Sequence, residues 1–138
     1  MKNTLLALFM TLVVSMVAHA ESDKQTSAAE QAMLTWLKMV DAGEYEASWQ
    51  TAGSMFRNNV TTAQWTQSAS SVRQPFGDFK QRRILGAKSI ENLPNAPEGQ
   101  YVVLQTLAEF QNQKGIETVT AVLENDQWQT VGYFIRKQ

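Results

Sequence analysis

Apolar side chains between residues 27 and 56 recur at intervals of three and four, the spacing of one helix face. Ser27 and Glu30 have the form of a capping box, so a first helix is predicted to begin there. Gly43 is placed to end it in a left-handed conformation. A second, shorter helix is predicted over residues 45–56. The inward positions of the two helices are Met33, Trp36, Leu37, Val40, Tyr45, Trp49, Ala52 and Phe56.

A third helix is predicted from a second capping box, formed by Thr61 and Gln64. Pro75 and Gly77 end this helix, because proline cannot continue the hydrogen-bond ladder and disfavours helix at the residue before it. The side chains predicted to face inward are Trp65, Ala69 and Val72.

The apolar pattern changes toward a period of two after residue 79, which is typical of strands. Strands are predicted over residues 80–90, 101–111, 116–124 and 128–136, with a bulge at Gly86 and a loop over residues 93–99. The last hairpin is predicted to turn at Asp126 and Gln127. The order predicts an α+β fold in which three N-terminal helices pack on one face of a four-stranded antiparallel meander.

The first twenty residues have the pattern of a cleavable signal peptide. Lys2 precedes an apolar run over residues 5–17, and Ala18 and Ala20 form the small-residue cleavage signature. We therefore expect cleavage after Ala20, a single domain over residues 21–138, and a periplasmic or secreted protein. The apolar run is shorter than the roughly 20 residues of a membrane span, so no membrane insertion is expected after cleavage.

Composition narrows the chemistry that is open to this domain. Residues 21–138 carry 11 basic and 13 acidic side chains, a net charge of minus two. This charge does not favour binding to the phosphate backbone of a nucleic acid. Arg82 and Arg83, with Lys80 and Lys88, are interpreted as a solvated strand face rather than a phosphate track. Cysteine is absent and the single histidine, His19, lies in the signal peptide, so Ser-His and Cys-His pairs, metal sites and cofactors are not expected.

Many positions of this chain resemble a secreted bacterial family catalogued as domain of unknown function 4019, which has no assigned reaction. In such proteins the last hairpin commonly turns on Asp-Gly, where this chain has Asp126-Gln127. The matching positions are Trp36, Leu37, Asp41, Gly43, Tyr45, Ser48, Trp49, Trp65, Arg73, Pro75, Gly77, Pro94, Pro97, Gly99, residues 101–103, Phe110, residues 117–119, Trp128 and residues 132–135.

The element order also resembles the cystatin-like, nuclear-transport-factor-two-like superfamily. That resemblance implies a curved sheet wrapped around a helix to make a cone. In many members the cone binds a small apolar ligand, and some members are isomerases or dehydratases. A likeness of fold does not decide the function.

Two glutamates are the candidate catalytic residues. A turn at Asp126 and Gln127 would set Val119 opposite Phe134 and Glu117 opposite Arg136. Glu117 is then either a general base or ligand anchor, or one half of an ion pair with Arg136. Glu109 either joins Glu117 as a paired acid and base or is a solvated strand residue.

The candidate binding residues are Arg73, Arg136, Trp36, Trp49 and Tyr133. Arg73 either clamps a carboxylate at a cavity mouth or binds the last carbonyls of its helix. Aromatic residues at helical and strand spacing either line a pocket or fill the core.

The sequence thus favours a non-catalytic exported binding or accessory module, with a small apolar ligand or a protein as partner and a homodimer through the sheet as one form. One alternative is a small cone-cavity enzyme of the isomerase or dehydratase type. The other is a structural envelope protein with an exposed apolar patch on its sheet. The discriminating observation is whether side chains fill the space between the sheet and the first helix.

Overall fold

The computed structural model describes the backbone of residues 2–138 and the side chains of residues 21–138. The predicted signal peptide, residues 1–20, therefore lies outside the part whose side chains are described. Within residues 21–138, no helix combines the length and the apolar character that crossing a membrane requires. The elements are α1 (Lys2–Asp41), α2 (Tyr45–Gln50), α3 (Ser54–Asn59), α4 (Thr62–Arg73), η1 (Gln74–Phe76), β1 (Phe79–Ile90), β2 (Tyr101–Phe110), β3 (Lys114–Glu124) and β4 (Gln127–Lys137).

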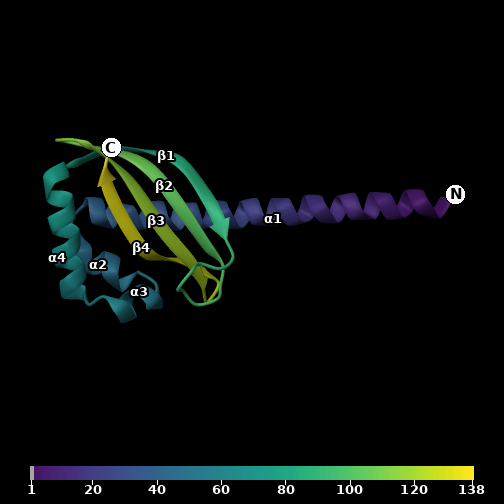
Figure 1. Ribbon diagram of the computed structural model, residues 1–138, viewed down its shortest axis with the longest axis horizontal. Coiled ribbons are helices and arrows are strands. Elements are labelled where there is room, and N and C mark those ends of the chain that lie inside the picture. Colours follow the sequence, from purple (N-terminus) through teal and green to yellow (C-terminus); the bar gives the residue numbers. More distant parts are fainter. Residues whose placement is uncertain (1) are drawn as a thin grey trace.

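Helix α1 lies along the sheet and contacts all four strands (Figure 1). The predicted start at Ser27 is wrong, because the helix runs without interruption from Lys2 to Asp41. The residues that precede Ser27 include no proline or glycine, and Ala, Glu, Lys and Gln all favour helix. The predicted end is confirmed: Gly43 has a φ of 74°, the left-handed conformation that glycine adopts without steric cost.

The second predicted helix is in fact two short helices, α2 and α3, so the chain has four α-helices rather than three within the described residues. The break falls where the chain docks on β4. The Gly53 N–H donates to the Thr130 carbonyl at 2.8 Å. A Cβ at Gly53 would lie 2.6 Å from Cγ1 of Val131, so only glycine fits this close approach.

Helix α4 begins at the predicted capping box, with Thr61 and Gln64 bonding each other's backbone N–H groups. Trp65 and Ala69 face inward as predicted, but Val72 does not, because its side chain is 39% exposed. The position one residue later, Arg73, takes the buried site instead. η1 and the left-handed Gly77 then end the helix, as the sequence predicts.

The four strands form an open antiparallel sheet in the order β1-β2-β3-β4, which confirms the predicted meander. The register between β1 and β2 shifts between Ile84 and Gly86, which confirms the predicted bulge. The face that contacts α1 is called the inner face here. The opposite face, which carries Phe134 with 62% of its surface exposed, is called the outer face.

The β3–β4 hairpin turns one residue earlier than predicted. Asn125 and Asp126 both have positive φ, at 52° and 61°, the pattern of a two-residue type I′ turn. Val131 is then an extra residue between the pairs Ala121–Thr130 and Thr120–Gly132. As a result, Val119 pairs with Tyr133 and not with Phe134, and Glu117 pairs with Ile135 and not with Arg136.

Side chains fill the space between α1 and the sheet. The helices contribute Met33, Trp36, Leu37, Val40, Trp65 and Ala69 to this core, and the sheet contributes Val102, Leu104, Val119 and Ala121. A smaller cluster, at the end of the sheet near η1, consists of Phe76, Ala108, Phe110 and Ile135.

We expect Asp126→Gly to stabilise the protein by about 0.5–1 kcal/mol, because glycine adopts positive φ more easily than aspartate does. Gln127→Gly is the matched control and should destabilise it by a similar amount, since residue 127 is the first residue of β4. Urea unfolding of the two variants measures both changes. The opposite order of stabilities would place the turn back at Asp126 and Gln127.

Candidate functional site

Four charged side chains of opposite sign lie buried together on the inner face. Asp41 is the last residue of α1, Arg73 the last of α4, and Arg82 and Glu117 lie on β1 and β3. Their side chains are at most 9% exposed. Two neutral hydroxyls, those of Thr106 on β2 and Tyr133 on β4, also bond to Glu117. These six residues are called the ion network below.

Arg82 is the centre of the ion network, because all three of its guanidinium nitrogens donate to carboxylates. Its Nε donates to Glu117 Oε1 at 2.6 Å, and its Nη1 donates to Asp41 Oδ2 at 2.9 Å. Its Nη2 lies 2.9 Å from Asp41 Oδ1 and 3.2 Å from Glu117 Oε2. The guanidinium also lies over the ring of Phe79, 4.4 Å from its centroid. Burial alone would lower the pKa of Arg82, but its bonds to Asp41 and Glu117 outweigh burial and raise the pKa.

Glu117 is completely buried and both of its oxygens accept hydrogen bonds. Besides Arg82, Oε1 accepts from the Thr106 hydroxyl at 2.8 Å and Oε2 accepts from the Tyr133 hydroxyl at 2.7 Å. Arg73 Nη1 adds a second positive charge at 3.9 Å from Oε2. Donors from β1, β2 and β4 therefore surround this buried carboxylate.

Arg73 connects the end of α4 to the same acceptors. Its Nη2 donates to Asp41 Oδ1 at 2.8 Å, and its Nη1 donates to the Tyr133 hydroxyl at 3.3 Å. The guanidinium lies 4.7 Å from the centroid of the Phe110 ring. Burial opposes the charge of Arg73, but Tyr133, Asp41 and Glu117 outweigh it and raise the pKa. The Arg73 Nε is buried and has no hydrogen-bond partner within the described part of the chain.

Tyr133 donates to Glu117 and accepts from Arg73, so its hydroxyl links the two sides of the ion network. Burial raises the pKa of this phenol, and the negative charge of Glu117 raises it further, while Arg73 acts in the opposite direction. The hydroxyl therefore keeps its proton at every physiological pH.

Two of the four ionic residues were missed by the sequence reasoning. Arg82 is not part of a solvated strand face, as interpreted, because its side chain is only 7% exposed, whereas Arg83 beside it is exposed. Asp41 was identified only as a position of the family resemblance. The signal available in the sequence was the alternation of side chains along a strand. Because the register shifts by one residue after Phe79, Arg82 points to the same face of the sheet as Phe79.

The sequence-predicted residues divide between the two faces of the sheet. Glu117, Arg73 and Tyr133 meet in the ion network. Glu109 lies on the outer face, where Gln81 and Lys114 hold its pKa below the usual value, so it cannot share a site with Glu117. Arg136 is exposed and pairs with Ile116, also on the outer face.

The tryptophans lie in the core or against it, and every indole N–H has a partner. Trp36 donates to the Ser48 carbonyl at 2.8 Å and Trp65 to the Ser48 hydroxyl at 2.9 Å. Trp49 donates to the Val60 carbonyl at 2.6 Å, and Trp128 to the Gln25 side chain at 3.2 Å. Ligand binding by Trp36 or Trp49 stays a prediction.

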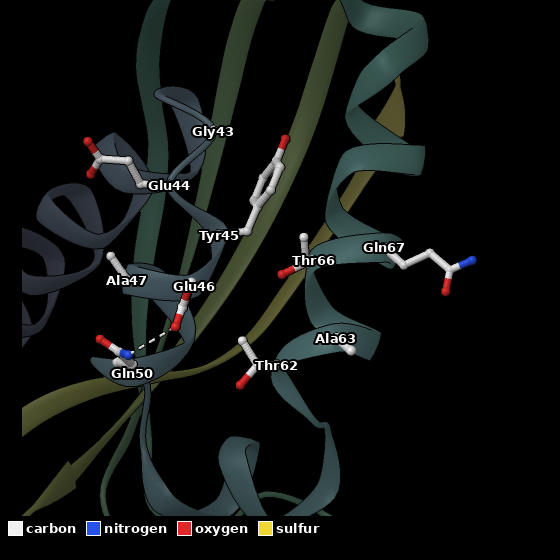
Figure 2. A pocket seen from close by; sticks show the side chains of 10 residues that line it. All are labelled: Gly43, Glu44, Tyr45, Glu46, Ala47, Gln50, Thr62, Ala63, Thr66 and Gln67. Atoms are coloured by element: carbon white, nitrogen blue, oxygen red, sulfur yellow. Dashed lines mark hydrogen bonds between the residues drawn. The ribbon is translucent and has the colours of Figure 1, made fainter.

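Two surface hollows adjoin this part of the molecule. A cleft of about 360 Å³ is bordered by Asp41 and Arg73 together with Tyr45 and Asp78. A broader groove of about 1110 Å³ lies between α2 and α4, with the ring of Tyr45 standing between the two helices (Figure 2). The groove carries two charges, those of Glu44 and Glu46, and no member of the ion network borders it.

Residues 32–133 match the family described as Protein of unknown function (DUF4019). The chain belongs to this family. All six residues of the ion network lie inside the segment that matches DUF4019. No curated protein and no solved structure matches the chain. Within residues 21–138, no group of three or more acidic or histidine side chains is arranged to hold a metal ion.

We expect Glu117→Gln to destabilise this DUF4019 domain by about 3–5 kcal/mol, because the substitution leaves the buried Arg82 and Arg73 short of a negative charge. Glu109→Gln is the matched control: its ion pair with Lys114 is exposed to solvent, so its loss should destabilise the domain far less. Guanidinium unfolding of both variants gives the comparison. Equal losses would show that the buried charges do not hold this fold together.

We expect the free energy of unfolding to fall less steeply with rising pH in Tyr133→Phe than in the wild type. In the folded protein the raised pKa keeps Tyr133 protonated, whereas in the unfolded chain it releases its proton above about pH 10. Rising pH therefore favours unfolding, by up to about 1.4 kcal/mol per pH unit from this residue. Urea unfolding between pH 9 and 11 should give a shallower decline for the variant than for the wild type. Parallel declines would contradict the buried position of this hydroxyl.

Proposed function

We propose that this protein is an exported, non-catalytic binding or accessory module that acts through its surface. The observation that carries the proposal is the filled space between α1 and the sheet, whose charges are paired with one another. An interior of this kind offers neither a cavity for a ligand nor a free group for a reaction.

The proposed alternative, a small cone-cavity enzyme, depends on Glu117 or Glu109 reaching a substrate. Glu117 has no exposed surface, and hydrogen bonds occupy both of its oxygens. Glu109 lies on the other face of the sheet. The cleft beside Asp41 and Arg73 is the observation that most favours the alternative, because the Arg73 Nε–H has no acceptor within the described residues and is left to donate to a ligand oxygen.

The proposed binding surface is the outer face of the sheet. The helices pack on the inner face, so no helix lies across the middle of the outer face (Figure 1). The β1–β2 loop covers the outer face at Tyr101 and Val122. Phe134 is 62% exposed there, and Leu107, Ile116 and Val103 are half-buried on the same face. A large exposed aromatic side chain within an apolar sheet face is typical of a protein interaction site.

Export after cleavage at Ala20 is part of the proposal. The apolar run over residues 5–17 and the Ala18-His19-Ala20 signature support it. Among residues 21–138, the first one in the core is Ala29, so a chain that begins at Glu21 keeps every core residue described above.

The full-length chain, expressed with its own first twenty residues, tests this proposal. We expect the periplasmic fraction to contain a protein that begins at Glu21 and whose native mass equals that of its polypeptide alone. The control variant replaces Ala18 and Ala20 with leucine, which should leave an uncleaved precursor.

Two results would contradict the proposal. Retention of a small molecule in stoichiometric amount, lost in Arg73→Lys, would favour the enzyme or ligand-binding alternative. An intact N-terminus and a cytoplasmic location for the wild-type chain would refute export.

A further inference from the structure

The outer face carries a net positive charge. The strand register places six charged residues on it, and they are Arg83, Lys88, Glu109, Lys114, Glu124 and Arg136. The face is thus positive by two charges, although residues 21–138 as a whole are negative by two. The remaining surface and interior carry seven basic and eleven acidic side chains, so the charge is segregated.

Three of these outer-face cations have no ionic partner. Lys114 pairs with Glu109 at 3.1 Å, but none of the ion pairs within residues 21–138 involves Arg83, Lys88 or Arg136. All three side chains are exposed. Unpaired cations of this kind are available to an incoming negative surface.

The unpaired cations lie at the margins of the apolar residues. One row across the sheet runs from Arg83 through Leu107 and Ile116 to Arg136, so a cation stands at each end of an apolar pair. In the next row Gln105 and Thr118 lead to the exposed Phe134. An apolar centre with a charged rim is the usual anatomy of a protein interface.

From this arrangement we infer that the outer face docks an acidic protein surface, with Phe134 on the edge strand β4 as its exposed apolar anchor. The inference rests on the proposed function and adds the chemistry of the partner. A second copy placed face to face is disfavoured, because a symmetric pair would bring two surfaces with a charge of plus two against each other.

A protein fits this face better than a lipid surface does. Gln105, Thr118 and Thr120 offer hydrogen-bonding groups between the apolar residues, and Phe134 is the outer-face side chain with the largest exposed fraction among the large hydrophobic residues. Four strands of about ten residues, spaced about 4.8 Å apart, cover roughly 600 Å² per partner. This area is at the lower end of specific protein interfaces and is sufficient for a transient complex.

Site-specific photocrosslinking of the full-length chain in its own cells tests the inference. A photoreactive phenylalanine replaces Phe134 on the outer face or, as the control position, the exposed Gln67 on α4. We expect a protein adduct from position 134 and none of the same mass from position 67. The crosslinked peptide of the partner should be rich in Asp and Glu.

Charge reversal then tests the rim. Combining Arg83→Glu with Arg136→Glu should reduce the adduct at least about tenfold, because rim charges govern association. The matched control reverses two exposed lysines of α1, Lys24→Glu with Lys38→Glu, and should leave the adduct unchanged. Replacing the acidic residues of the partner's crosslinked peptide by lysine should restore it, and thermal unfolding should show that both double variants remain folded.

Several results would overturn the inference. They are an adduct with a second copy of this chain, an adduct that the Arg83 and Arg136 reversals leave unchanged, and no adduct at position 134. Binding to phosphatidylglycerol vesicles that the reversals abolish, with no protein adduct, would assign the face to a lipid. These outcomes are distinct from failure of the proposed function, which the N-terminal and native masses report separately.

Discussion

Arg82 joins the end of α1 to the middle of the sheet, and the arrangement of the inner face depends on that connection. Its three nitrogens bind Asp41 at the last turn of α1 and Glu117 at the centre of β3. Thr106 and Tyr133 bring β2 and β4 to the same carboxylate, and Arg73 brings the end of α4. One buried group of charges therefore fixes two helix ends against all four strands. Because an unpaired charge in this position is costly, the elements are held in one relative placement.

Much of this fold follows from local patterns, and the errors share one cause. The strands, the end of α1 at Gly43 and the capping box at Thr61 were predicted correctly because each depends on adjacent residues. The break before α3 was missed because it depends on a contact between Gly53 and β4, which no local pattern reports. The hairpin at Asn125 was missed because two neighbouring dipeptides fit a two-residue turn, and the bulge at Val131 then changes every later pair.

The candidate site was harder to predict because its residues come from six elements. Glu117 was identified as a candidate catalytic carboxylate or ion-pair partner, but the partner was placed on the adjacent strand at Arg136. The actual partner, Arg82, lies two strands away on β1, and its side chain reaches Glu117 across β2. Two adjacent arginines, Arg82 and Arg83, were both interpreted as exposed to solvent. In a strand the two alternate, so Arg82 faces the core and Arg83 faces the outside.

That alternation also explains how the domain separates stability from interaction. On the inner face Arg82 and Arg73 form ion pairs with Asp41 and Glu117, so these charges stabilise the fold and are not available to a partner. On the outer face β1 presents Arg83, and β4 presents Arg136 near the exposed Phe134, without an ion pair to either arginine. Cations that add nothing to the fold and repel one another are a cost to the isolated domain. Their grouping around an apolar centre is explained if a negatively charged surface offsets that repulsion when it docks.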